Sequence, residues 1–130
     1  MTLDEYNRFC ASLPHAHSVV QWGGAHVWKI GGKVFAIGGW DDGKTLAVTF
    51  KCSPMSFDLL KSEPGLRPAP YLASRGMSWL QRTNEDSMDD SALRDYLRES
   101  HRLASLNLSK AVQKKLGLNE VQAVISKSER

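Results

Sequence analysis

The chain has 130 residues, of which 42% are hydrophobic and 24% charged, and its formal net charge is +3. This length and composition are typical of one soluble globular domain, and they disfavour a disordered chain. The opening residues are too polar for a signal peptide and no run approaches the roughly 20 apolar residues of a membrane span, so we expect a cytoplasmic protein without a membrane partner. The cysteines, Cys10 and Cys52, are too few for a disulfide scaffold and suit a reducing compartment.

The first predicted element is a short amphipathic helix that ends at Pro14. Thr2 and Glu5 have the spacing of a capping box, in which each side chain bonds the backbone N–H of the other residue. Leu3, Tyr6 and later apolar residues recur at helical spacing, which predicts one buried side for this helix.

A meander of antiparallel strands is predicted next. Its segments have the β-branched and aromatic residues that strands favour, and the turns between them have the glycines that supply positive φ angles in tight hairpins. The segments are 19–22, 26–30, 34–40 and 45–51, and the turns are Gly23-Gly24, Gly31-Gly32 and Asp42-Gly43.

If the last two turns are two-residue loops, the pairing of the strands follows by counting. Phe35 then lies opposite Trp28 and Phe50, and Ile37 lies opposite Val48. Because opposed residues share a face, one face of the sheet is predicted to form the core. The predicted core face carries Trp28, Ile30, Phe35, Ile37, Leu46, Val48 and Phe50. The other, open face carries Val27, Lys29, Val34, Ala36, Gly38, Trp40, Thr45, Ala47, Thr49 and Lys51.

The middle of the chain predicts a helix, a stiff loop and one more strand. Ser53 and Pro54 are typical of a helix start, and that helix is expected over 54–63. The segment 64–76 is rich in proline and glycine and predicts a loop without regular structure. A strand over 77–81, at an edge of the sheet, is expected to follow.

The C-terminal part predicts helices. A long helix is expected from Asp89 to about residue 106, and Ser109 can cap a last helix that Gly117 ends. The predicted fold is α+β, a two-layer sandwich in which helices cover one face of an antiparallel sheet. The domain is expected to span residues 1–118, and the tail 119–130 is either a short helix or frayed.

Several segments resemble the MmcQ/YjbR family in their order along the chain. They are Val20-Gln21-Trp22-Gly23, Val27-Trp28-Lys29, Gly31-Gly32-Lys33-Val34-Phe35-Ala36, Arg67-Pro68-Ala69-Pro70-Tyr71-Leu72 and Trp79. The resemblance covers about residues 2–118. It implies a small α+β fold related to secretion chaperones, and a proposed DNA-binding role in which protruding hairpins act as a double wing. It implies no catalytic residues.

The predicted open face offers a candidate DNA-binding site. Lys29 and Lys51 flank Val34 there, about 10 Å apart at two strand spacings. Trp40 shares that face, and Trp22 does so if the first turn is also a two-residue loop. Two cations and flat aromatic rings, over a floor of small residues at Ala36, Gly38 and Ala47, can hold phosphates and a stacked base. Alternatively, the lysines serve solubility and the tryptophans pack under the segment 64–76 or the last helix.

Further basic residues lie on turns and loops. Lys33 and Lys44 stand at hairpin tips, where a wing would contact phosphates, but two aspartates beside Lys44 weaken the second tip. Arg67 and Arg75 bracket the proline-rich segment and can fork phosphates. The alternatives are ordinary exposed turn lysines, and arginines that bond backbone carbonyls in a loop that caps the sheet edge.

Signals of an enzyme or a metal site are few. The glycine-rich segment 38–43 lacks the spacing of a nucleotide-binding loop, and His15 and His17 have no second ligand pair. The basic stripe on the long helix, at Arg94, Arg98 and Arg102, has acids three or four residues away and predicts a solvated face.

We therefore expect a non-catalytic protein without metal or other cofactor. It is expected to bind DNA mainly through phosphates and with little sequence selectivity. The alternatives are an adaptor that binds a protein or peptide on the half-open sheet face, and a small-molecule-binding protein.

Overall fold

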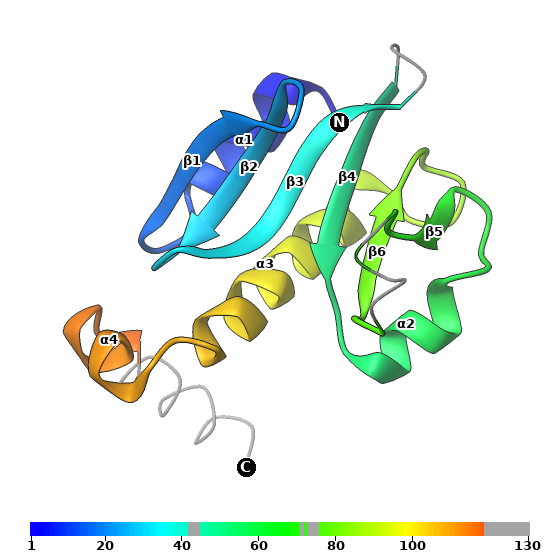
Figure 1. Cartoon of the computed structure of the whole chain (residues 1–130). Helices are drawn as coiled ribbons and strands as arrows, with labels where there is room; N and C mark the ends of the chain where they lie inside the picture. Colours follow the sequence, from blue (N-terminus) through cyan, green and yellow to red (C-terminus); the bar gives the residue numbers. More distant parts are fainter. Residues whose placement is uncertain (42–44, 71, 73–75, 119–130) are drawn as a thin grey trace.

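The computed structural model describes residues 1–41, 45–70, 72 and 76–118, and its elements form an antiparallel sheet with helices (Figure 1). In chain order they are α1 (Leu3–Ala11), β1 (Ala16–Gln21), β2 (Ala25–Ile30), β3 (Lys33–Asp41), β4 (Thr45–Lys51), α2 (Pro54–Leu60), β5 (Leu66–Pro68), β6 (Trp79–Arg82), α3 (Asp90–Leu106) and α4 (Lys110–Lys115). The strands form one 6-stranded sheet in the order β1-β2-β3-β4-β6-β5. The predicted α+β class is confirmed.

Two helices cover the same face of the sheet. Helix α3 packs across β2, β3 and β4, and α1 packs against β1 and β3. In Figure 1 both helices lie behind the strands, so the opposite, open face is turned toward the viewer. The core between the layers contains the fully buried Tyr6, Ile30, Phe35, Val48, Phe50, Leu80, Leu93 and Leu97.

Helix α1 is fixed at its start and along its buried side. The predicted capping box forms, because Glu5 N donates to Thr2 Oγ1 and Thr2 N to Glu5 Oε1, both at 3.1 Å. The hydroxyl of Tyr6 donates to the carbonyl of His26 at 2.8 Å. Gly38 of β3 leaves room for the Tyr6 ring, since a Cβ at this position would lie 2.5 Å from it. Helix and sheet therefore approach closely at this glycine.

Helix α3 begins as predicted, with Asp89 as its N-cap, and it closes an irregularity in the sheet. The pairing of β2 with β3 shifts by one residue, so that Lys29 faces Val34 while Trp28 faces Ala36, and Phe35 is left as a bulge. The hydroxyl of Ser100 on α3 donates to Phe35 O at 2.6 Å and accepts from Lys51 N at 2.8 Å. It thereby bridges β3 and β4 beyond their last pair, Ala36 with Phe50.

The predicted pairing of β3 with β4 is wrong by one residue. Asp41 faces Thr45, so three residues connect these strands rather than two, and Ile37 faces Thr49 instead of Val48. The predicted faces of β2 and β4 hold, but those of β3 after the bulge are exchanged. Ile37 lies on the open face, whereas Ala36, Gly38 and Trp40 lie on the helix face opposite Phe50, Val48 and Leu46.

The segment predicted as a loop contains a strand. Residues Leu66–Pro68 form β5, and β6 lies between β4 and β5 rather than at an edge. Helix α2 ends at Leu60, three residues before the predicted end. The predicted last helix is present as α4, with Ser109 as its N-cap, and the tail 119–130 lies outside the described residues.

Candidate functional site

The open face has a row of residues that crosses the whole sheet. Each member is paired with the next on the neighbouring strand, so all of them point to the same side. From β1 to β5 the row is Val19, Val27, Ile37, Thr49, Gln81 and Arg67. The row is apolar on the first three strands and polar on the last three.

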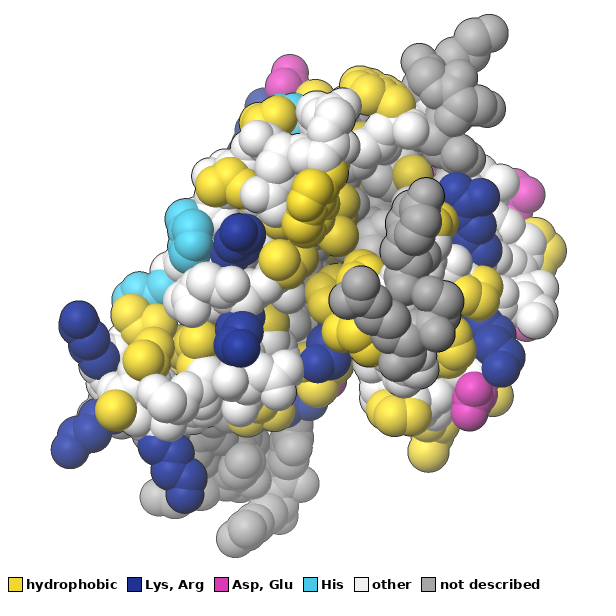
Figure 2. All heavy atoms as spheres, in the orientation of Figure 1, with side chains coloured by type: hydrophobic (Ala, Val, Ile, Leu, Met, Phe, Trp, Pro, Cys, Tyr) yellow, Lys and Arg dark blue, Asp and Glu magenta, His cyan; other side chains and the backbone are white. Residues whose placement is uncertain are grey.

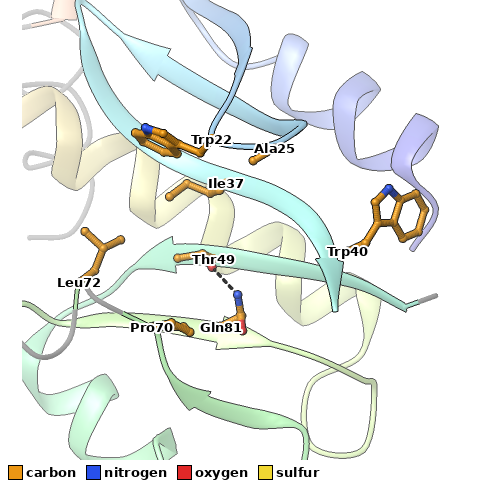
Figure 3. A pocket seen from close by; sticks show the side chains of 8 residues that line it. All are labelled: Trp22, Ala25, Ile37, Trp40, Thr49, Pro70, Leu72 and Gln81. Atoms are coloured by element: carbon orange, nitrogen blue, oxygen red, sulfur yellow. Dashed lines mark hydrogen bonds between the residues drawn. The ribbon is translucent and has the colours of Figure 1, made fainter. Parts of the chain in front are cut away.

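A pocket of about 720 Å³ lies over the middle of this row (Figure 3). Trp22 and Ala25, from the hairpin of β1 and β2, lie on one side of it, and Pro70 and Leu72, which follow β5, lie on the other. Among the described residues, all that line the pocket are uncharged: Trp22, Ala25, Ile37, Trp40, Thr49, Pro70, Leu72 and Gln81. The pocket therefore suits a mostly apolar group with a few polar atoms.

The polar side of the pocket is held by a chain of hydrogen bonds. Arg67 Nε donates to Gln81 Oε1 at 2.7 Å, and Gln81 Nε2 donates to Thr49 Oγ1 at 3.1 Å (Figure 3). Because the arginine side chain is only a donor, the carbonyl oxygen of the Gln81 amide must face Arg67. Thr49 is only 4% exposed, so the amide of Gln81 is anchored from the protein interior.

Trp22 owes its position to an unusual turn. The turn between β1 and β2 has three residues, because Gln21 faces Ala25. Its residues all have positive φ angles, 51° for Trp22, 76° for Gly23 and 101° for Gly24. A bulky side chain in this region costs about 1–3 kcal/mol. The turn places Trp22 at the pocket with 64% of its surface exposed, although the expected two-residue loop does not form.

Trp40 does not share the face of Trp22. It pairs with the buried Leu46 on the helix side of the sheet, and its indole points toward α1 at the far end of the pocket (Figure 3). The prediction of two tryptophans side by side on the open face is therefore wrong. The predicted floor is also only partly present, since Ala47 lies on the open face but Ala36 and Gly38 do not.

Lys29 and Lys51 both lie on the open face. Lys29 is two residues beyond Val27 on β2 and faces Val34, and Lys51 is two residues beyond Thr49 on β4. Since β2 and β4 run in the same direction, both lysines stand on the same side of the row. Ala25 is two residues before Val27 and lies on the other side of the row. The lysines thus lie beside the pocket on the open face, although neither is among the described residues that line it.

The remaining candidate residues are spread over the molecule. Lys33 is exposed beside the turn of β2 and β3, which rests on Leu108, because a Cβ at Gly31 would lie 2.8 Å from that side chain. Arg67 bonds Gln81 as described, whereas Lys44 and Arg75 lie outside the described residues. Figure 2 shows lysines and arginines as separate spots on the open face, with the few acidic side chains near its margins.

Two of the three arginines of the predicted stripe on α3 are paired within their own helix. Arg98 bonds Asp95 and Arg102 bonds Glu99, each at 2.6 Å. These bonds agree with the prediction of a solvated face on α3. The lysines of the open face therefore do not continue a row of unpaired arginines on α3.

Burial shifts the pKa values of both cysteines and of His101. Burial raises the pKa of the Cys10 thiol to about 12 and that of Cys52 to about 11, which makes both poor nucleophiles. Burial also lowers the pKa of His101, whose Nε2 lies 2.8 Å from the carbonyl of Pro14. In the part of the chain that the structure describes, no cluster of His, Cys, Asp or Glu has the composition of a metal site. No helix of this part is long and apolar enough to cross a membrane.

Gln81, Ile37 and Leu72 were missed as site residues, whereas Pro70 belongs to the segment Pro68-Ala69-Pro70-Tyr71 under which a small-molecule pocket was the third alternative. The only sequence signal for Gln81 is its place in a strand beside the apolar Leu80. Its partners Arg67 and Thr49 come from two other strands, so only the order β4-β6-β5 reveals the site.

Comparisons with known proteins agree on the fold. The family model YjbR matches residues 11–103. The crystal structure of a Deinococcus radiodurans protein with a DUF419 domain is similar at a TM-score of 0.76 and 23% identity, covering 90% of this chain and 88% of that chain. A protein from Pseudomonas syringae is similar at a TM-score of 0.64 and 14% identity, covering 80% and 99%. A search of the curated proteins found no match.

Proposed function

The chain belongs to the YjbR family, and from this premise we propose that its open sheet face binds DNA, mainly through phosphates and with little sequence selectivity. The observation that carries the proposal is the placement of Lys29, Lys51 and the exposed Trp22 on the sheet face that holds a pocket lined, among the described residues, by uncharged side chains. Cations fix a nucleic-acid backbone, and an exposed indole offers a stacking surface for a base.

The distribution of charge supports this face rather than a helix. Acidic side chains are few on the face that Figure 2 shows, whereas on α3 they pair with the arginines. Arg67 lies on β5 at one end of the same face and extends the area that a phosphate backbone can follow. Lys33 pairs with the buried Ile30 and stands at the hairpin tip on the helix side of the sheet. The proposal includes a double-wing contribution of the hairpin tips, in which Lys33 contacts phosphates.

The proposal is tested by the salt dependence of binding to a labelled DNA. For about three to five phosphate contacts, the slope of log affinity against log salt is roughly −3 to −5. Replacing Lys29 and Lys51 together by alanine should make this slope shallower by about 2 and weaken binding equally for unrelated sequences.

A matched control removes the same charge elsewhere. Lys61→Ala with Arg94→Ala takes one cation from the C-cap of α2 and one from α3 and should leave most of the affinity intact. Affinity that stays constant from low to high salt, or an equal loss in both double variants, would contradict a binding site on the open face.

A protein- or peptide-binding adaptor is the second candidate. The observation that favours it is the apolar half of the open face, where Val19, Trp22 and the pocket adjoin the edge strand β1. Pull-down with and without nuclease separates the two functions, because partners bridged by nucleic acid are lost after digestion.

A further inference from the structure

We propose that the pocket holds one unpaired nucleobase, hydrogen-bonded by Gln81 and stacked on Trp22. If the base is part of a DNA strand on the open face, this inference rests on the proposed function. A free nucleotide would offer the same base to the pocket, and comparing a DNA strand with a mononucleotide separates these two sources.

The shape and lining of the pocket fit a flat heterocycle. Its volume of about 720 Å³ lies within the range of roughly 300–1,000 Å³ that small-ligand sites occupy. Ile37 and Ala25 offer apolar contacts to a ring, and Trp22 offers an exposed indole plane at the rim. A base in a duplex cannot enter such a pocket, so the occupant must be unpaired.

Gln81 supplies the polar recognition. A carboxamide has two N–H donors and an oxygen with two acceptor positions, and the bonds to Thr49 and Arg67 use one of each. Within the part of the chain that the structure describes, one donor and one acceptor therefore remain on a group whose orientation is fixed by its neighbours. Every base has a donor and an acceptor next to each other on its Watson–Crick edge, which is the complement of this pair. Recognition of this kind accepts any base and agrees with little sequence selectivity.

The lysines are placed for the backbone of the same nucleotide. Lys51 and Lys29 each stand two residues, about 7 Å, along their strands from the row that passes under the pocket. They lie on the side of the row away from Ala25. A strand with its base in the pocket can thus leave its phosphates on the lysine side.

The test compares two labelled single strands with the same number of phosphates, one with bases and one abasic. Wild-type protein should bind the base-bearing strand roughly five- to hundredfold more tightly, which is the range for stacking of a base on an aromatic side chain. It should also prefer this strand over a duplex of equal length. Trp22→Ala and Gln81→Leu should each lose this preference and keep the affinity for the abasic strand.

Controls separate a local effect from loss of structure. Gln21→Leu removes a carboxamide from β1 outside the pocket and should keep the preference, as should Trp22→Phe, which retains a flat ring. Melting temperatures are compared for all variants. If Gln81→Leu does not fold, the pair Trp22→Ala and Trp22→Phe decides, because this side chain is exposed on a turn.

The outcomes distinguish this inference from the proposed function. Equal binding of the base-bearing and abasic strands overturns the base pocket and leaves DNA binding intact. A mononucleotide that binds as tightly as the strand, in a manner dependent on Gln81, supports the base pocket and rejects DNA as its source. Absence of binding to both strands and to mononucleotides overturns both.

Discussion

The Ser100 hydroxyl stabilises the sheet where the pairing of β2 with β3 shifts and the pairing of β3 with β4 ends. It is fully buried and bonds one backbone carbonyl and one backbone N–H, those of Phe35 and Lys51. The bulge at Phe35 would otherwise leave these groups without partners in the sheet. A serine on a helix thus makes an irregular sheet compatible with a tightly packed interior.

We expect Ser100→Ala to lower the free energy of unfolding by about 2–4 kcal/mol. Each buried backbone group left without a partner costs about 1–3 kcal/mol. Urea denaturation measures the change, and Ser91→Ala on the exposed side of the same helix is the control, with an expected change within about 0.5 kcal/mol. An equal effect of both substitutions would contradict the bridging role of Ser100.

At the scale of elements, the contact of α1 with β3 depends on a missing side chain. Gly38 faces the ring of Tyr6, and the neighbouring Gly39 faces the other side of the sheet. A Cβ at Gly38 would lie 2.5 Å from the ring, whereas the nearest heavy atom to a Cβ at Gly39 would be 4.0 Å away. The two adjacent glycines therefore form a natural matched pair for a test.

Gly38→Ala should destabilise the protein by about 1–3 kcal/mol, because the added methyl group pushes α1 away from the sheet. Gly39→Ala should change stability by less than about 0.5 kcal/mol. Thermal melting of both variants is the measurement. A Gly38→Ala protein that melts with the wild type would show that α1 adjusts without cost.

How far sequence can predict these elements is seen best on β3. Periodicity identified β2, β3 and β4 and the correct faces of β2 and β4. The bulge shifts the residues of β3 after Phe35 by one position relative to β2, which exchanges the faces of Ile37 and Trp40. The three-residue connection shifts the pairing of β3 with β4 by one more position, so the two shifts cancel and β4 keeps its predicted faces. The sequence around Phe35 does not signal the bulge, because the residue that stabilises it, Ser100, lies 65 residues away in the chain. The length of the connection after β3 is likewise not fixed by the sequence pattern of the strands.

The candidate site was predictable in part for the same reason. Lys29 and Lys51 were placed on the open face by strand alternation, which is a local pattern. Trp22 was placed there on the condition of a two-residue turn, and the turn has three residues. Gln81 was missed, because its partners are brought to it by β5, a strand of three residues within a proline-rich segment. Short strands of this kind form through tertiary packing rather than intrinsic preference.

At the scale of the whole molecule, the two faces of the sheet have different tasks. The helix face buries the large apolar side chains and sets stability, as Ser100 and Gly38 illustrate. The open face keeps a pocket, two lysines and a row that is half apolar and half polar. Substitutions on the open face should therefore change binding with little effect on melting, which the variants of Lys29, Lys51 and Trp22 examine.

The contrast between the four tryptophans gives the protein an intrinsic optical probe. Trp28 and Trp79 are buried, and Trp22 and Trp40 are exposed. Both exposed tryptophans line the pocket, but the indole of Trp40 lies at its far end and points toward α1. Soluble iodide should quench the emission of the exposed pair alone. An occupant of the pocket should shield one of these two indoles, so that about half of the iodide-sensitive fluorescence becomes inaccessible, and Trp22→Phe should abolish this protection. Unlabelled titrations can thus report occupancy directly.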